Sequence, residues 1–497
     1  MEEGLHHKLT GINSSLPYFL PEVILVGGII LIVFVGLFNI GKKELLMRVL
    51  AAVMLALVLY FDIRQWLHED NVRQLFLDMV TLDRAAILWK ILFGTGGLFT
   101  VLMGFKYRGW YDKSGEYYAL MLSVVFGAHL VAMASNLLMI FIGIEVISIS
   151  SYILTTFSFN KNSTEAGLKY LLFGAAASGV MIFGMSWLYA FTGSLAFTEQ
   201  SFLEMLMKAD ALPLIIASLF VTAGLLFKIS AAPMHIWAPD VYTSAPTPVV
   251  AFFSIVPKLA GFAILVRWML VIKLFGFSPV DWAAVLAVVA MLTIAIGNFS
   301  ALWQNNAKRM LAYSSIAHSG FLLIGLVAFS ELAIQSLLFY AAIYILMNVA
   351  AFIYVSYLER EYNIINIKDY KGFVRTSPLI ATVLVVIMIS LTGLPPTAGF
   401  TAKLLIFSAL WDGYAATDHT MMLYLLIFGL LNAVVSLFYY LKIPYFMIFK
   451  EGAHEGKAKK LYTIENFLGF FMVLALLILF FKPDGLMRMI NSVSFAF

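Results

Sequence analysis

About fourteen stretches of roughly twenty mostly apolar residues follow one another along the sequence, and this pattern limits the chain to one class of fold. A helix needs about 20 such residues to cross the hydrocarbon core of a bilayer. Of the 497 residues, 62% are hydrophobic and only 12% are charged, whereas soluble domains are about half apolar and a quarter charged. The sequence therefore predicts an all-α, polytopic membrane protein.

The predicted spans lie near residues 19–39, 45–62, 84–105, 117–134, 136–158, 166–192, 211–233, 247–273, 281–303, 309–329, 332–357, 376–411, 421–443 and 464–482. The twelfth is too long for one straight helix, and residues 391–400 read LTGLPPTAGF. Two prolines and two glycines in ten residues break a helix. We therefore expect a discontinuous twelfth span.

The loop charges predict the orientation of these spans. With the N-terminus outside, seventeen Lys and Arg residues fall on the cytoplasmic side and nine on the outer side. The positive-inside rule then places both termini outside. The first residues lack a basic region and a cleavage site, so we expect the first apolar segment to act as the insertion signal. The net charge of +4 implies no nucleic-acid partner.

The sequence has no cysteine. Thiolate-held iron–sulfur clusters, zinc–thiolate sites and attached c-type haem are therefore excluded within it. No phosphate-binding glycine loop, metal-ligand cluster or nucleophile arrangement appears either. We expect this chain to bind no metal, cofactor or redox centre of its own.

Two spans combine a lysine with a helix breaker. Residues 223–233 read AGLLFKISAAP, with Lys228 before Pro233, whereas Lys403 follows the Pro395-Pro396 pair. Because a repeat with an odd number of spans re-enters the membrane in the opposite sense, this mirrored order predicts an inverted-repeat transporter with broken helices 7 and 12. The alternative is two unrelated proline kinks packed by neighbouring helices.

Glu145, Lys228, Lys258 and Lys403 lie deep inside predicted spans. A charge at the bilayer centre costs roughly 2.5–3.5 kcal/mol on insertion scales, so a chain that keeps several is expected to use them. A buried lysine can gain or lose a proton as a carboxylate partner comes or goes. The pattern favours a proton relay over static ion pairs that hold helices together.

Histidines add candidate bridges for such a relay. His235 follows Lys228 by seven residues and shares its face if the helix continues through Pro233; His318 lies early in the tenth span. Imidazole titrates near neutral pH and passes protons between its two nitrogens. His129 is a weaker candidate, and nothing in the histidine spacing selects a haem.

The other charges have plainer interpretations. Glu22 stands at the start of the first span, where the helix dipole stabilises an acid. Five further cations lie near span ends and can reach the interface by snorkelling: Lys90, Lys169, Arg267, Lys273 and Lys442. Lys169 is also a candidate for the path by which protons are taken up from the cytoplasm.

Longer motifs carry a family resemblance. Residues 227–242 read FKISAAPMHIWAPDVY, residues 297–318 read GNFSALWQNNAKRMLAYSSIAH, and residues 393–403 read GLPPTAGFTAK. With Glu145, these motifs resemble the antiporter-like membrane subunits of respiratory complex I over residues 117–445. The Pro-Asp-Val-Tyr connector, Lys403 in place of a glutamate, and the short segment after the last span are similar to N-type members. We also expect no long lateral helix.

The resemblance implies a fold of two inverted five-helix repeats. Helices 4–8 would span residues 117–273 and helices 9–13 residues 281–445, flanked by three helices in residues 1–116 and by a cytoplasmic loop and helix 14 in residues 446–497. By the same resemblance, Glu145 would pair with Lys228, Lys258 would be the central relay, Lys403 the outlet lysine, and His235 and His318 the bridges.

The resemblance also implies a function and partners. The chain would be a proton-translocating subunit of NADH:quinone oxidoreductase in a bacterial inner membrane. NADH, FMN, the iron–sulfur clusters and quinone would bind partner subunits, with M-type and K-type chains as neighbours. Two alternatives stay open: a subunit of a Mrp-type Na⁺/H⁺ antiporter, and a purely structural membrane scaffold whose buried charges are replaceable.

Overall fold

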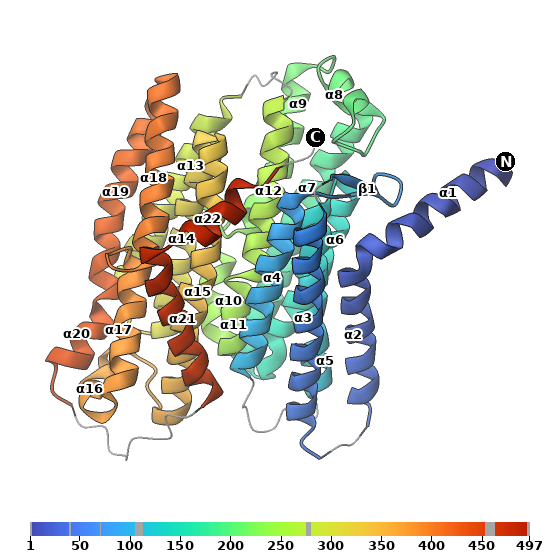
Figure 1. Cartoon of the computed structure of the whole chain (residues 1–497). Coiled ribbons are helices and arrows are strands. Elements are labelled where there is room, and N and C mark those ends of the chain that lie inside the picture. The colour runs from blue at the N-terminus through green and yellow to red at the C-terminus, as the bar shows by residue number, and fades with distance from the viewer. Residues whose placement is uncertain are drawn as a thin grey trace. The chain divides into compact units, whose positions relative to one another are not determined.

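A computed structural model describes residues 2–38, 41–69, 71–104, 113–274, 280–452 and 463–494, and these residues are nearly all helical (Figure 1). In the described part of the chain, 13 helices are long and apolar enough to cross a membrane. They correspond to thirteen of the predicted spans. The twelfth is divided between α17 (Pro378–Thr392) and α18 (Ala398–Thr417). The all-α membrane fold and its broken twelfth span are confirmed.

Short polar side chains begin many of the helices. Asn160 accepts a hydrogen bond from the backbone N–H of Ser163 at 2.9 Å, and Asn306 accepts one from that of Arg309 at 3.0 Å. Such caps satisfy backbone donors that have no partner inside the helix. Side chains that cap in this way are Asp83, Asn136, Asn160, Asp281, Asn306, Ser330 and Thr463. The polar residues between apolar segments thus fix where helices start.

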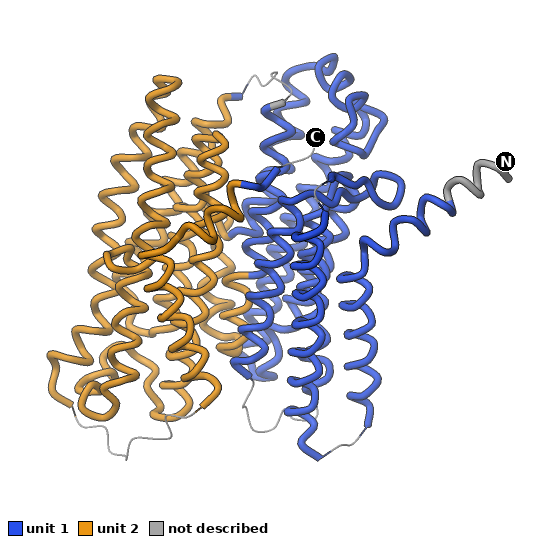
Figure 2. The backbone as a smooth tube through the Cα atoms, viewed as in Figure 1, with its two compact units in different colours: residues 1–229, 256–280, 492–497 blue, residues 230–255, 281–491 orange. Residues whose placement is uncertain are grey.

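The chain forms two compact units (Figure 2), and the first comprises residues 1–229, 256–280 and 492–497. Its helices are α1 (Glu2–Ser15), η1 (Leu16–Phe19), α2 (Leu20–Gly36), α3 (Lys43–His68), α4 (Arg84–Met103), α5 (Ser114–Met133), α6 (Leu137–Thr155), η3 (Thr156–Ser158), α7 (Lys161–Thr192), α8 (Gln200–Leu206), α9 (Ala211–Lys228) and α12 (Val256–Leu274). Helices α2 to α5 pack on one another, and α12 packs against α4, α5 and α9.

A short hairpin, which the helical pattern did not predict, joins α3 to α4. Strand β1 (Arg73–Leu75) pairs antiparallel with β2 (Val80–Leu82), with Arg73 opposite Leu82. Its apolar side chains are buried against residues of α4 and α5. The hairpin therefore closes one end of these helices.

The second unit comprises residues 230–255 and 281–491. Its helices are α10 (Trp237–Ser244), α11 (Thr247–Phe253), α13 (Trp282–Leu302), α14 (Ala307–Ala328), α15 (Glu331–Tyr362), η4 (Ile367–Tyr370), α16 (Phe373–Thr376), α17, α18, α19 (Thr420–Tyr440), α20 (Lys442–Phe449), α21 (Ile464–Phe481) and α22 (Asp484–Asn491). The predicted eighth span is therefore divided: α11 belongs to this unit and α12 to the first. The predicted inverted repeats stay a prediction.

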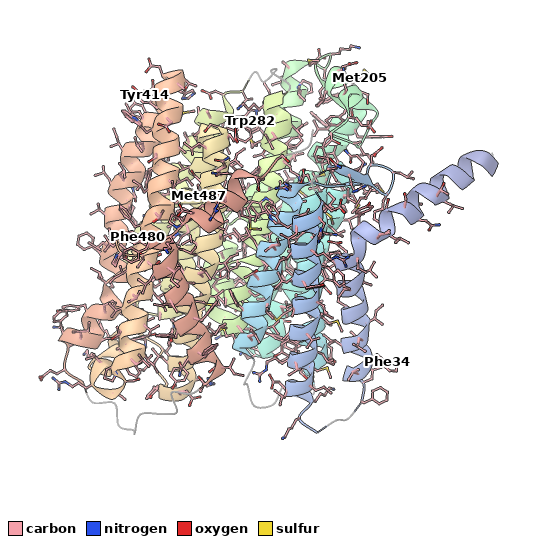
Figure 3. The ribbon with its side chains drawn as sticks, in the orientation of Figure 1. Phe34, Met205, Trp282, Tyr414, Phe480 and Met487 are labelled. Atoms are coloured by element: carbon pink, nitrogen blue, oxygen red, sulfur yellow. The ribbon has the colours of Figure 1, made fainter. Side chains whose placement is uncertain are left out.

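Helices α2, α3 and α19 present apolar side chains outward, as lipid-facing helices do. Ile30, Leu431 and Phe438 are each 63% exposed, and Phe34 projects from the end of α2 in Figure 3. Large exposed apolar surfaces of this kind mark contact with lipid or with another protein. Five of the Lys and Arg residues that were counted for the predicted orientation lie outside the described residues, namely Lys106, Arg108, Lys457, Lys459 and Lys460.

One ion pair ties the start of α21 to the C-terminal end of α15. Arg360 of α15 donates to both carboxylate oxygens of Glu465, at 3.0 and 2.6 Å, and the glutamate side chain is 6% exposed. We expect Glu465→Gln to lower stability by about 2 kcal/mol, because hydrogen bonds to charged groups contribute about that much. The matched variant is Glu361→Gln, which also removes a partner of Arg360 but a more exposed one, and should cost less than about 1 kcal/mol. Equal apparent melting temperatures of the two variants in detergent would contradict this expectation.

Candidate functional site

Helix α9 ends at Lys228, inside the apolar segment. Ser230 has a left-handed backbone (φ 56°), and the backbone N–H of Ala232 donates to Thr293 Oγ1 at 2.9 Å, which holds the chain away from a helical path. The next helix, α10, begins at Trp237. The predicted break after Lys228 is confirmed. Lys228 and His235 would share a helix face only if the helix continued through Pro233. The helix ends before Pro233, so the two residues do not share a face.

Lys228 is almost fully buried and belongs to a cluster with α6 and α7. Its Nζ donates to Ser148 Oγ on α6. One turn earlier on α6, Glu145 accepts a hydrogen bond from Ser178 Oγ on α7 at 2.5 Å. Glu145 is half-buried and close enough to Lys228 for their charges to interact. The structure thus brings the acid and the lysine together, with two serines as their hydrogen-bond partners.

Lys258 lies in the first turn of α12 and is 1% exposed. One turn later, Gly261 faces the end of α9. A Cβ atom on Gly261 would lie 3.2 Å from Lys228 Cβ and 2.7 Å from Ile229 Cγ2. Because an α-helix makes a turn in 3.6 residues, Lys258 and Gly261 share a face. Lys258 therefore lies beside the Lys228 cluster. Pro257 falls in the first turn of α12, where proline is tolerated.

Lys403 lies at the second helix break. Its Nζ donates to the carbonyl oxygen of Thr392 at 2.6 Å, at the C-terminal end of α17. That end carries open carbonyls and the negative pole of the helix dipole, both of which stabilise a cation. Gly393 has φ 84°, and a Cβ there would lie 2.6 Å from Lys403 Cδ. A pocket of about 310 Å³ reaches Lys403 from the surface between α18 and α19.

His318 is buried on α14 and uses both ring nitrogens. Nδ1 lies 2.8 Å from the hydroxyl of Tyr340, and Nε2 lies 3.0 Å from that of Tyr440. Ser314 hydrogen-bonds the same Tyr440 hydroxyl at 2.5 Å. Each hydroxyl can donate and accept, so the ring and its partners can relay a proton without any side chain moving far.

A second line of polar groups runs beside His318. Tyr344 lies beside the imidazole of His318, with ring centres 5.1 Å apart and the rings tilted by 45°, and donates to Ser315 at 2.9 Å. Asn348 donates to the Tyr344 hydroxyl at 3.1 Å and to Ser254 Oγ at 2.5 Å. Ser254 precedes Lys258 by four residues in the chain. The sequence patterns did not reveal these tyrosines, because the chain has 23 tyrosines and nothing in their spacing distinguishes these from the others.

Two predicted site residues stand apart. His235 lies half-buried in the irregular segment before α10, and its Nδ1 is buried without a hydrogen-bond partner among the described residues. Lys169 of α7 is partly exposed and pairs with Glu165 at 2.9 Å. Their predicted roles, bridging and proton uptake, stay predictions.

The interface-snorkelling interpretation is wrong for two of the five cations. Lys90 is 0% exposed and pairs with Glu22 at 2.8 Å. Arg267 is 1% exposed, pairs with Asp83 at 2.7 Å and donates to the carbonyl of Ala132 at 2.8 Å. Both cations stay in the interior because a carboxylate repays their desolvation. Glu22, interpreted as a helix-dipole residue, is a member of this buried charge cluster.

The fold and the buried charges define a polytopic membrane protein whose lysines sit at two broken helices, as in ion-translocating membrane proteins. Residues 134–436 match the family described as "NADH:quinone oxidoreductase/Mrp antiporter, TM". The chain belongs to this family of membrane proteins, as the motifs predicted.

Individual relatives cover nearly the whole chain. It is 38% identical over 493 residues to the NADH-quinone oxidoreductase subunit N 2 of Chloroherpeton thalassium, covering 96% of this chain and 95% of the relative. It is 37% identical over 451 residues to the NAD(P)H-quinone oxidoreductase subunit 2 of Synechocystis, covering 89% and 84%.

Solved structures share the fold. A chain of respiratory complex I from Thermus thermophilus is 28% identical, with a TM-score of 0.78 over 95% of this chain and 100% of that one. A chain of the Mrp complex from Dietzia is 18% identical, with a TM-score of 0.79 over 95% and 96%. The second likeness concerns the fold alone.

Proposed function

We propose that this chain is a proton-translocating membrane subunit of an NADH:quinone oxidoreductase of the complex I type. The observation that carries the proposal is the set of three lysines, Lys228, Lys258 and Lys403, buried in membrane helices next to helix breaks. A chain retains such costly groups when they act. The 38% identity to a relative named NADH-quinone oxidoreductase subunit N 2 supports the same assignment.

The proposed mechanism is electrostatic. Glu145 is half-buried, so a charge on a neighbouring subunit can act on it. When Glu145 moves toward or away from Lys228, the lysine gains or loses its main stabilising charge and takes up or releases a proton. The proton passes to Lys258 and finally to Lys403, with the hydroxyl groups around His318 as bridges. Lys403 would be the outlet lysine. Lys169 and His235 would serve proton uptake and bridging.

The redox chemistry belongs to other chains in this proposal. NADH, FMN, iron–sulfur clusters and quinone would bind partner subunits, and this chain would answer only to the charge changes that they produce. The neighbours would be other membrane-arm subunits, of the M-type and K-type. The assembly would lie in a bacterial inner membrane, with both termini of this chain on the outer side.

A Mrp-type Na⁺/H⁺ antiporter subunit is the second candidate, because the matched family includes those proteins and the Dietzia chain shares the fold. In that case no redox partner is needed, and ion gradients alone drive the lysines. The two candidates differ in what the chain assembles with.

Co-purification distinguishes the complex I proposal from the antiporter candidate. We expect the tagged chain, extracted in mild detergent, to bring down inhibitor-sensitive NADH:quinone reductase activity. An untagged strain carried through the same column is the control for carry-over. If the tagged assembly contains only hydrophobic chains and oxidises no NADH, the complex I proposal fails and sodium-dependent proton exchange in vesicles becomes the assay to run.

A further inference from the structure

A second cluster of buried ionisable groups lies in the first unit. Its helices do not carry the proposed relay residues Glu145, Lys228, Lys258 and Lys403. The cluster contains Glu22 of α2, Asp62 of α3, Lys90 of α4 and His129 of α5, and all four are 0% exposed. Lys90 Nζ lies 2.8 Å from Glu22 Oε1 and 3.1 Å from Asp62 Oδ1. His129 Nδ1 lies 2.9 Å from Glu22 Oε1.

The four side chains meet at one end of a helix bundle. Helices α2 to α5 alternate in direction and pack on one another (Figure 1). Glu22 stands in the first turn of α2 and Lys90 in the second turn of α4, whereas Asp62 and His129 stand in the last two turns of α3 and α5. The cluster therefore lies at the end that holds the start of α2, the outer side by the loop charges.

The charges of the cluster do not balance without one more positive charge. Two carboxylates face a single ammonium, so a neutral imidazole would leave one net negative charge in the interior. Burying an unpaired charge is costly. Helix α12, which packs on α4 and α5, contributes Arg267, but Asp83 already neutralises it. One proton, held by His129 or by a carboxyl group, restores neutrality.

The cluster also offers places where that proton can sit. Asp62 Oδ2, Glu22 Oε2 and His129 Nε2 are buried without a hydrogen-bond partner among the described residues. His129 Nε2 and Asp62 Oδ2 lie 3.9 Å apart, which is longer than a hydrogen bond but within reach of small side-chain movements. A metal ion fits less well, because the Lys90 ammonium already lies between the two carboxylates.

A polar link connects this cluster to the surface. Lys90 Nζ donates to Gln65 Oε1 at 3.0 Å, and Gln65 Nε2 donates to the carbonyl of Tyr18 at 2.8 Å. Gln65 and Tyr18 line an open pocket of about 360 Å³, together with the ionisable groups of Arg64, His68 and Glu69. One side chain therefore separates the buried ammonium from the pocket.

We propose that Glu22, Asp62, Lys90 and His129 form a second proton-binding site. It holds one exchangeable proton, shared by Asp62 and His129, while Glu22 and Lys90 stay ionised as a pair. The proton comes from and returns to the aqueous phase through the pocket at Gln65. This site is independent of the proposed pump, since it follows from the charge count and contacts of the flanking helices alone.

Infrared difference spectroscopy of the full chain in lipid nanodiscs tests the site without any activity assay. Between about pH 5 and 8, where imidazole titrates, we expect the cluster to contribute one carboxyl or imidazolium band beside the bands of the other titrating groups. Asp62→Asn should remove this band and still fold, because Glu22 and Lys90 remain balanced. His129→Gln gives the same test from the other partner. Asp412→Asn, at an exposed position of α18, is the matched control and should keep the full band.

The access route has its own test. Gln65→Leu should leave the size of the band unchanged and slow its response to a pH jump at least tenfold. The proposal is overturned if Asp62→Asn and His129→Gln both keep the wild-type spectral change. It is also overturned if the band answers to added sodium or a divalent cation at constant pH but not to pH, which would make the cluster a metal-cation site.

Discussion

Replacing Lys228 with methionine is expected to reduce proton translocation by roughly 10²-fold, because a positioned proton-transfer group contributes 10²–10⁴-fold to the step it serves. Methionine is flexible and apolar and fills the space of the lysine stem, so the chain should still assemble. Removal of the Lys228 ammonium leaves Glu145 with Ser178 as a hydrogen-bond partner but without the cation with which its charge interacts. The measurement is proton uptake per NADH oxidised, in liposomes that contain the purified assembly.

Lys228→Arg separates a relay from a static ion pair. Arginine keeps the positive charge beside Glu145 but cannot release a proton near neutral pH. A relay therefore predicts that this variant is as inactive as Lys228→Met, whereas a static pair predicts nearly full activity. Lys208→Met, at an exposed position after α8, is the control and should pump normally. Full pumping by an assembled Lys228→Met complex would refute the relay.

The helix breaks and the lysines beside them could be predicted from the sequence because their signal is local. A lysine and a proline within one apolar segment are each costly in a membrane helix, and together they mark the ends of α9 and α17. The family motifs cover the same segments. The helix breaks therefore have two independent signals in the sequence, the costly residues and the motifs.

The position of His235 could not be predicted, because the exact end of α9 depends on a distant contact. Ala232 donates to Thr293, which is 61 residues away along the chain, and a seven-residue spacing says nothing about such a bond. The helical-face argument needed a continuous helix, and the chain leaves the helix at Lys228 instead.

The cluster at Lys90 was missed for a related reason. Lys90, Asp62 and Glu22 each lie near the end of their own span, where a charge usually reaches water and needs no partner. Only the packing of α2 to α5 shows that these ends meet in the interior, with Glu22 and His129 separated by 107 residues. A usable signal was present: each of four consecutive spans carries an ionisable residue within about two turns of its predicted outer end, namely Glu22, Asp62, Lys90 and His129.

Gly399→Ala is expected to lower both the stability of the chain and its activity. Gly399 lies in the first turn of α18, where a Cβ atom would fall 1.9 Å from the carbonyl oxygen of Ser390 and 3.0 Å from Met347 Sδ. Because the atom at 1.9 Å is a backbone oxygen of α17, it cannot move aside as a side chain could. Helices α17 and α18 must therefore separate. Overpacking of this kind costs about 1–3 kcal/mol. Because Lys403 stands one turn later on α18, the separation also moves its ammonium from the carbonyl of Thr392.

Two comparisons make this expectation testable. Gly179→Ala on α7 is the matched control, since a Cβ atom there meets nothing within 4 Å and alanine favours a helix by about 0.5–1 kcal/mol over glycine. Lys403→Met should stop pumping without lowering the melting temperature much, because it removes the ammonium but not the close contact of the helices. Gly399→Ala should lower both, and a variant that melts and pumps like wild type would show that α17 and α18 do not need their close approach to hold Lys403 at the helix end.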